Sequence, residues 1–560
     1  MTDSPAPATQ PAIIKTGRNL PIWMIASWLV VLSVLAPIGA LFYLALQPSD
    51  GVWGHLVSTV LPRATWTTLL LMAGVGSVTA FIGVTTAWLV SMCHFPGRRL
   101  FDWLLLVPLA MPTYIVAFAY VEILDFTGPV QTALRQVLGV TSARDYWFPE
   151  VRSLGGAVFV MSVVLYPYVY LTTRAMFLMQ SACMLDVART LGSSPLHTFF
   201  RVALPLARPA IAVGVTLALM ECVNDIGAVE FFGVKTLTFT IYDTWLNRGS
   251  LAGAAQIACV MLLFVLGLVI AERFARRKQR FHITSKRYQA LPNFELRGAQ
   301  AGLASLLCAT PVLLGFAFPA ALLASSAVKR LTPDLLLTFI EPALNSLMLA
   351  SFAAAATVGA GVVIAYTQRY DQRPITKLAA RLGSIGYAVP GTVLAVGILI
   401  PLASLDNAVD GFMRSAFGIS TGLLLAGSGT ALVYAYSVRF LAVSIGGAES
   451  GLSRVTTSLD MAARTLGRSA GETLRDVHLP IIRTALVSAA MLVFVDCMKE
   501  LPATILLRPF NFDTLATVVY TQASLEAFED AAPAALMIVL VGLIPVALLA
   551  RTSKTSHRSG

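Results

Sequence analysis

Charged side chains are scarce in this chain of 560 residues. They make up 12% of it, while hydrophobic residues make up 57%, and an ordinary soluble domain is roughly 25% charged. A chain this apolar cannot have water as its only solvent, which excludes a soluble globular protein. Uncharged runs of about 20 residues are long enough to cross a bilayer as a helix, and such runs recur along the whole sequence. We therefore predict an all-α integral membrane protein.

Cysteine and histidine are also few, with six of each. The cysteines form no C-x-x-C pair and the histidines are dispersed, which excludes a disulfide framework and a zinc site and argues against a membrane enzyme. The chain has no Gly-Lys dipeptide, so it lacks the phosphate-binding loop that ends in Gly-Lys followed by Ser or Thr. We expect the chain to bind no cofactor and to do no covalent chemistry.

Ten uncharged runs are long enough to span a membrane as they stand. They cover residues 19–49, 64–97, 103–121, 153–173, 249–271, 298–328, 342–368, 382–405, 415–438 and 531–550. Two shorter runs, 209–220 and 484–495, are interrupted by carboxylates but follow matching polar loops. Counting them predicts about 12 transmembrane helices, six in each half. An even number per half makes the halves parallel repeats, with corresponding loops on the same side of the membrane.

Basic residues set the expected orientation. If both termini are cytoplasmic, the cytoplasmic segments hold 27 of the 40 Lys and Arg residues, in agreement with the positive-inside rule. Topology and anionic lipid then explain the net charge of +11, which requires no nucleic acid. The first apolar run is too long for a signal peptide, so we expect it to be the first helix of a multi-pass protein.

The expected domain organisation follows the two halves. It comprises a cytoplasmic tail (1–20), a first six-helix domain (21–272), a basic cytoplasmic linker (273–298), a second six-helix domain (299–551) and a short cytoplasmic tail (552–560). Polar loops at 180–207 and 447–482 occupy corresponding places in the two domains.

These two loops contain a segment that is repeated 275 residues apart. Residues 186–205 and 461–480 are identical at half of their 20 positions, without a gap. Gly192 and Gly467 can take the left-handed conformation that ends a helix, and Ser469 begins an S-x-x-E capping box. We expect each loop to form an elbow of two short helices. A Leu-Pro pair should end the second helix, because the residue before a proline disfavours the α region.

The repeated segment resembles the signature of the binding-protein-dependent ABC importer permeases, in which E-A-A is followed at fixed spacing by Gly and then by I-x-L-P. The matching residues are Ala188, Gly192, Val202, Leu204 and Pro205 in the first copy, and Ala462, Ala463, Gly467, Val477, Leu479 and Pro480 in the second. The acidic position departs from the signature. Asp186 stands there in the first copy but Met461 in the second, with Asp460 one residue earlier.

The resemblance implies the type I ABC importer permease fold in a bacterial inner membrane. In this family the elbow sits in a groove of a separate ATPase subunit, which uses the ATP, so two elbows imply two ATPase copies. An extracytoplasmic binding protein supplies the substrate. The coupling residues carried over are Asp186, Ala188, Arg189, Gly192 and Pro205, and Asp460, Ala463, Arg464, Gly467 and Pro480. We expect Arg189 and Arg464 to be exposed on the first helix of each elbow.

Carboxylates interrupt the fifth span of each half at corresponding positions. Glu221 and Asp225 recur as Asp496 and Glu500 at the same offset of 275. A spacing of four places both acids of a pair on one face of a helix. Charges at this depth usually face a bundle interior or a water-filled path, and broken spans at matching positions point to a translocation path.

Six polar residues of these two spans are predicted to line the path. They are Glu221, Asn224, Asp225, Asp496, Lys499 and Glu500. The four carboxylates, offset in part by Lys499, favour a hard cation that prefers oxygen ligands, and all four are candidate transient metal ligands. In the structural alternative, Lys499 neutralises a neighbouring acid and the acids only hold the halves together. We expect Gly227 and Pro502 to interrupt the two helices.

Longer stretches are similar to fused permeases of ferric iron importers. They are residues 221–238, 248–258, 386–397 and 496–517, in the same order along both halves. This resemblance implies a permease that passes Fe(III) inward by alternating access. Fused permeases for thiamine and for 2-aminoethylphosphonate share the architecture and stay open as alternatives. A secondary transporter would need no ATPase, and the twin elbows count against it.

Overall fold

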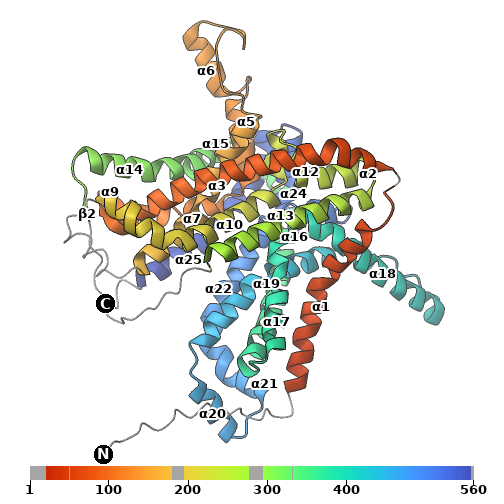
Figure 1. The fold of residues 1–560 in the computed structure, drawn as a ribbon. Coiled ribbons are helices and arrows are strands. Elements are labelled where there is room, and N and C mark those ends of the chain that lie inside the picture. Colours follow the sequence, from red (N-terminus) through yellow and green to blue (C-terminus); the bar gives the residue numbers. More distant parts are fainter. Residues whose placement is uncertain (1–19, 50, 180–194, 277–293, 331, 556–560) are drawn as a thin grey trace, which may run out of the picture.

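The computed structural model describes residues 20–49, 51–179, 195–276, 294–330 and 332–555 (Figure 1). It contains 12 helical segments that are long and apolar enough to cross a membrane, six in each half of the sequence. In these ranges the only strands are β1 (Cys93–His94) and β2 (Phe294–Glu295). The predicted all-α fold with six spans per half is confirmed.

The first half is built on six long helices. They are α1 (Leu20–Ala45), α3 (Leu61–Met92), α5 (Thr113–Leu124), α7 (Leu154–Met179), α10 (Leu204–Asn224) and α13 (Leu251–Arg276). Shorter helices connect or extend them. These are α2 (Val52–His55), α4 (Arg98–Leu104), α6 (Pro129–Leu138), α9 (Pro195–Thr198), α11 (Gly227–Phe231) and α12 (Leu237–Tyr242).

The second half repeats this plan. Its spans are α14 (Ala299–Val312) with α15 (Phe318–Arg330), then α16 (Pro333–Tyr370), α18 (Gly391–Phe417), α19 (Gly429–Ser453), α22 (Leu479–Met498) and α25 (Phe528–Thr555). Its short helices are α17 (Pro374–Gly383), α20 (Thr457–Thr465), α21 (Ala470–Thr473), α23 (Thr504–Leu507) and α24 (Leu515–Ser524).

Wider π-helical turns lie within several of these spans. They are η1 (Leu56–Val60), η3 (Phe199–Ala203), η4 (Asp243–Asn247), η5 (Leu313–Ala317) and η7 (Leu474–His478). All except η4 end two residues before a proline. Proline has no N–H for the carbonyl four residues earlier, and the wider turn lets carbonyls bond one residue further along, as when Leu479 N–H donates to the Leu474 carbonyl.

The elbow helices therefore do not end at their Leu-Pro pairs. Residues 199–224 and 470–498 each form one continuous helical segment, with Pro205 and Pro480 close to the start of α10 and α22. The prediction that Leu-Pro ends the second elbow helix is wrong. The π turn absorbs the missing hydrogen bond, so the chain passes from elbow to span without a corner.

Three predicted span boundaries also differ from the structure. The runs 103–121 and 382–405 were expected to start the third spans, but α5 and α18 begin only after Pro112 and Pro390, which follow the short 3-10 turns η2 (Val107–Ala110) and η6 (Ile385–Ala388). The run 415–438 stopped at a charge, Arg439. That residue instead lies in the middle of α19.

The first span of each half packs against the other half. In Figure 1, α1 lies beside α17 and α14 lies beside α3, and contacts join α1 to α16, α17 and α18, and α14 to α3, α4 and α7. The approach is close, because a Cβ built on Gly397 of α18 would lie 2.2 Å from the carbonyl oxygen of Pro37. In the other direction, the Tyr120 hydroxyl of α5 donates to the carbonyl of Leu314 at 2.9 Å.

A two-residue parallel ladder adds a further link between the halves. β1 follows α3 directly and pairs with β2, which precedes α14, in the register Cys93 with Phe294 and His94 with Glu295. The N–H of Leu296 extends the ladder by donating to the His94 carbonyl at 3.0 Å. The start of the second half is thus fastened to the end of the second span of the first.

Candidate functional site

One pocket brings together all six residues that the sequence predicted to line the path. Three come from the end of the α10 span and three from the end of the α22 span, and they are Glu221, Asn224, Asp225, Asp496, Lys499 and Glu500. Side chains of α5, α7 and α19 complete the wall. The cavity volume is about 80 Å³, which is room for one ion and a few water molecules. The pocket therefore lies between the two halves.

The two helices end before each acid pair is complete. α10 ends at Asn224 and α22 ends at Met498. Asp225 and Glu500 follow in the breaks of the helices, so the prediction that each pair shares one helix face is wrong. The breaks allow the two acids to turn toward the short helices that follow them.

Gly227 has a different role from the one predicted. It is the first residue of α11 and does not interrupt the helix; the interruption occurs two residues earlier. A Cβ on Gly227 would lie 2.7 Å from the Cβ of Tyr114 and 3.0 Å from Leu501, so this position needs glycine for close packing between the halves. Pro502 does lie within the second break.

Asp225 and Glu500 cap the helices that follow the breaks. Each carboxylate accepts the backbone N–H three residues ahead, at 2.9 Å for Asp225 and 3.0 Å for Glu500. Asp225 also accepts the hydroxyl of Thr113, and Glu500 accepts the hydroxyl of Thr504 at 2.7 Å. The two residues are buried, and buried carboxylates need such donors. These two acids have a clear structural task.

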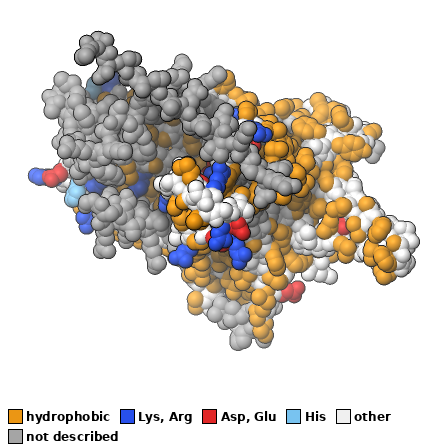
Figure 2. All heavy atoms as spheres, turned by 90° about the horizontal axis from the view of Figure 1, so that it is seen from below, with side chains coloured by type: hydrophobic (Ala, Val, Ile, Leu, Met, Phe, Trp, Pro, Cys, Tyr) orange, Lys and Arg blue, Asp and Glu red, His pale blue; other side chains and the backbone are white. Residues whose placement is uncertain are grey.

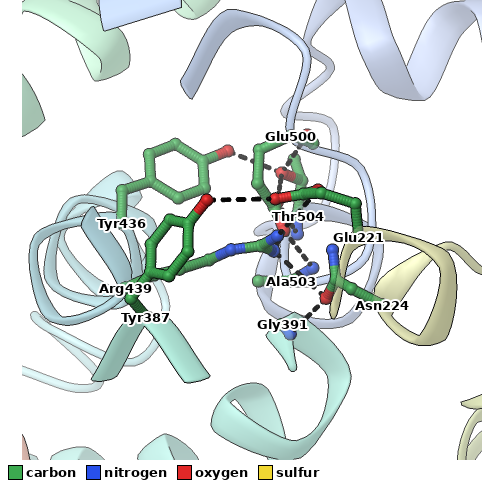
Figure 3. Close-up of polar contacts among 9 residues, drawn as sticks. All are labelled: Glu221, Asn224, Tyr387, Gly391, Tyr436, Arg439, Glu500, Ala503 and Thr504. Carbon is green, nitrogen blue, oxygen red and sulfur yellow. Dashed lines mark hydrogen bonds and ion pairs between the residues drawn. The ribbon is translucent and has the colours of Figure 1, made fainter. Parts of the chain in front are cut away.

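Arg439, which the sequence analysis missed, lies between the acids of the two halves (Figure 3). This α19 residue is 6% exposed. Its Nη1 lies 2.9 Å from Oε1 of Glu500 and 3.2 Å from Oδ1 of Asn224, and its Nη2 lies 3.9 Å from Oε2 of Glu221. In the sequence, Arg439 directly follows the uncharged run 415–438 and so marked the predicted end of that span. An arginine inside a span is itself a signal of function.

The second cation of the pocket pairs locally. Nζ of Lys499 lies 2.9 Å from Oδ1 of Asp496, three residues earlier, so one element of the structural alternative is confirmed. Four carboxylates face two cations, which leaves an excess of two negative charges. Glu221 and Asp496 are the partly exposed acids, with 27% and 29% of their side chains accessible. Within the described ranges, no group of three or more His, Cys, Asp or Glu is arranged to hold a metal ion.

The elbow of the second half is described over its full length, on both sides of its bend. α20 ends before Gly467, which has a φ of +75°, and Ser469 forms the predicted capping box with Glu472 at the start of α21. Ala463 is buried and Arg464 is exposed, as expected. Figure 2 views this end of the molecule, where basic side chains gather among hydrophobic ones.

Most of the first elbow lies outside the described residues. This holds for Asp186, Ala188, Arg189 and Gly192. The described part begins with α9 at Pro195, continues through η3 and includes Pro205 in the first turn of α10.

Asp460, the acid of the second elbow, is turned toward its own spans. Its Oδ2 lies 2.6 Å from Nη2 of Arg369, near the end of α16, and its Oδ1 lies 2.7 Å from Nε2 of His478 in η7. Arg369 also donates to the carbonyls of Leu452 and Val455, at 2.6 and 2.9 Å. The carboxylate therefore fastens the elbow to α16, to the end of α19 and to the start of the fifth span.

Comparison with known proteins finds relatives among transport permeases. Residues 79–280 match the model of the binding-protein-dependent transport system inner membrane component. The Fe(3+)-transport system permease protein FbpB 2 of Haemophilus influenzae is 24% identical over 490 residues, which cover 86% of this chain and 88% of the relative. The probable ABC transporter permease protein y4fN of Sinorhizobium fredii is 22% identical over 94% of both chains.

A shorter relative matches a smaller part of the chain. The molybdenum transport system permease protein ModB of Escherichia coli is 28% identical over 228 residues, which cover 39% of this chain but 96% of the relative. The alignments with the longer relatives cover 86% and 94% of this chain and thus extend into both six-span repeats.

Proposed function

This chain is a fused permease of a binding-protein-dependent ABC importer, and from that premise we propose that its cargo is Fe(III). An extracytoplasmic binding protein delivers the ion, and two copies of a separate ATPase subunit drive its passage to the cytoplasm. The permease is not itself an enzyme and binds no cofactor. Both of its termini lie on the cytoplasmic side.

The charge balance of the pocket between the halves carries this proposal. Its excess of two negative charges attracts a cation, and carboxylate oxygen is a preferred donor for hard cations. Glu221 and Asp496, one from each half, are the acids with accessible side chains. They are placed to meet an ion that enters the cavity. Asp225 and Glu500 also line the pocket and add to its negative potential. Their carboxylates accept backbone N–H groups at the starts of the helical segments that follow the breaks.

Two further observations support iron. The similarity to the Fe(3+) transport permease extends over 86% of this chain, so it is not confined to one of the two repeats. The cavity volume of about 80 Å³ suits an ion with a few water molecules.

Uptake of radioactive iron by the complete importer in proteoliposomes tests the proposal. The double variant Glu221→Gln with Asp496→Asn removes both accessible charges at nearly constant shape, and iron uptake should fall about tenfold or more, which equals about 1.4 kcal/mol of lost stabilisation. Glu295→Gln is the control, because that acid is exposed and pairs only with Arg297 outside the pocket in the described structure. Unchanged iron uptake by the double variant would refute the proposal.

The second candidate cargo is a tetrahedral oxyanion. It is favoured by the two cations in the pocket, Arg439 and Lys499, and by the similarity of part of the chain to a molybdenum permease. The sign of the effect separates the two candidates. Removing the acids lowers uptake of a cation but raises uptake of an oxyanion, while Lys499→Gln does the reverse.

A secondary transporter is the remaining alternative. Its uptake rate would depend on an ion gradient and would not change when the ATPase is left out.

A further inference from the structure

We propose that Arg439 is a resident counter-ion that closes the path when no cargo is present. In this role its guanidinium bridges Glu221 of the first half and Glu500 of the second, and an arriving cation must displace it from Glu221 before the halves can separate there. We call these residues, together with Asn224, the Arg439 bridge. The inference rests on the proposed function, because it assigns a regulatory part to the same pocket.

The first argument is that Arg439 links the halves directly. It extends from α19 in the second half, and two of its three polar partners, Glu221 and Asn224, belong to α10 in the first half. The Oδ1 of Asn224 also accepts the backbone N–H of Gly391 at 2.6 Å. Figure 3 shows Glu221 and Asn224 beside the guanidinium of Arg439, with the Gly391 nitrogen bonded to Asn224. Separation of α10 from α19 would break this set of contacts.

The second argument is that the fold leaves space for the guanidinium. A Cβ on Gly391 would lie 2.8 Å from Nη1 of Arg439 and 2.7 Å from Oε1 of Glu500, so any larger residue would intrude on the ion pair. Gly391 is the first residue of α18 after Pro390. The matching first residue of α5 is Thr113, whose hydroxyl donates to Asp225. One half supplies a hydroxyl for its capping acid, and the other half leaves room for an arginine.

The third argument is that the bridge exists only once in the pocket. The residue 275 positions before Arg439 is Val164, which also lines the pocket. An internal repeat that used arginine merely to brace each half would place one at both positions. A single charge that contacts residues of both halves couples them.

The fourth argument is that the contact of Arg439 with Glu221 is weaker than its contact with Glu500 and therefore breaks first. Glu500 holds three donors besides Arg439, namely two backbone N–H groups and the hydroxyl of Thr504. Glu221 is held at longer range, at 3.9 Å from Arg439 and 3.5 Å from the Tyr387 hydroxyl. The side of the bridge that faces Glu221 is therefore the weaker one. A multivalent cation that binds Glu221 replaces a single positive charge with a larger one, so the carboxylate stays neutralised during the exchange.

The test uses the complete importer in proteoliposomes, without binding protein and without iron. ATP hydrolysis and leak of K⁺ are measured for Arg439→Gln, which removes the charge, and for Arg439→Lys, which keeps it. The Gln variant should raise both rates by about fivefold or more, the lower end of typical coupling between two sites. The Lys variant should stay within about twofold of the unsubstituted permease on the same scale.

Two further variants keep the result interpretable. Gly391→Ala retains every charge but places a Cβ within the ion pair, so it should raise both rates even if Arg439→Gln fails to fold. Arg174→Gln is the matched control, because Arg174 is an arginine of the fourth span of the other half whose guanidinium pairs with Asp102 at 2.6 Å, away from the pocket. It should leave both rates unchanged.

The outcomes separate this inference from the cargo proposal. Baseline rates in both Gly391→Ala and a folded Arg439→Gln would overturn the Arg439 bridge, as would an equal rise in the Arg174→Gln control. Because iron is absent from these measurements, a permease with another cargo can still show the bridge. Conversely, iron uptake with no leak in the variants leaves the cargo proposal standing and removes the bridge.

Discussion

Partly buried charges determine how the second elbow is held. The signature position carries Met461, which is 52% exposed, and the neighbouring Asp460 has turned inward, with 14% of its side chain accessible. There it meets Arg369 and His478. An acid in such a place depends on its partners, because an uncompensated charge with little access to water is costly. Asp460, one residue before the signature position, therefore holds the elbow against Arg369 and His478.

Arg369→Ala should lower the free energy of unfolding by about 2 kcal/mol, because the pair is partly buried and hydrogen bonds to charged groups contribute about 1.5–3 kcal/mol. The variant also loses the hydrogen bonds of Arg369 to two backbone carbonyls. Thermal unfolding of the purified permease in detergent measures the change. Arg373→Ala is the control, since that side chain is 69% exposed, and it should cost within about 0.5 kcal/mol. Equal stability of the two variants would contradict the fastening role of Asp460.

At the scale of elements, the elbow and the fifth span form one mechanical unit. α20 bends at Gly467, and α21 then continues through η7 into α22 with no corner at Pro480. A displacement of α21 is therefore carried along a helix to Asp496, Lys499 and the break before α23. The same π turn at η3 connects α9 to α10 in the first half. The elbow and the pocket are thus linked by a continuous helical backbone.

Two glycines of this elbow should respond in opposite directions to alanine. Gly467 has a φ of +75°, whereas Gly471 lies in α21, and a Cβ at either position would meet nothing within 4 Å. Gly467→Ala should destabilise the elbow by about 1 kcal/mol, because a left-handed backbone is strained for alanine. Gly471→Ala should stabilise the helix by about 0.5 kcal/mol or more. Hydrogen exchange of the α20 and α21 amides measures both, and a stabilising Gly467→Ala would contradict the bend.

At the scale of the whole molecule, the two repeats are interlocked. α1 packs on helices of the second half, and α14 packs on helices of the first. Glycine makes the first of these contacts possible at Gly397, where the backbone of α1 approaches at Pro37. The sequence-based domain limits, 21–272 and 299–551, stay a prediction for the repeats, but α1 and α14 each pack on helices of the other repeat.

The two halves should therefore assemble even when the chain is cut between them. Residues 1–276 and 294–560, coexpressed as separate chains, should copurify from membranes, because each contributes a helix to the other. The control lacks residues 1–46 and hence α1, and its recovery with the second half should fall about tenfold, which equals about 1.4 kcal/mol of lost affinity. Separate purification of the two intact halves would contradict this packing.

Much of this organisation was readable from local pattern. Twelve spans follow from hydropathy because lipid demands long apolar helices, and the repeat at an offset of 275 correctly located the second elbow and its capping box. It also located all six polar residues of the pocket. Span ends were less predictable, since a charge such as Arg439 was read as a boundary. The pairing of Arg439 with Glu221 of the other half is not visible in the sequence, because it depends on which helices become neighbours.

The sequence by itself determined that the chain spans a membrane, that it contains an internal repeat, where the elbow helices bend and are capped, and which polar residues are candidates for the path. These features depend on composition and on spacing along one segment. The tertiary structure alone decided the rest. It placed Arg439 between Glu221 and Glu500, turned Asp460 inward, and packed α1 and α14 each on helices of the other repeat. These features depend on which helices become neighbours. A charge in the membrane interior takes its role from the partner that the fold brings to it.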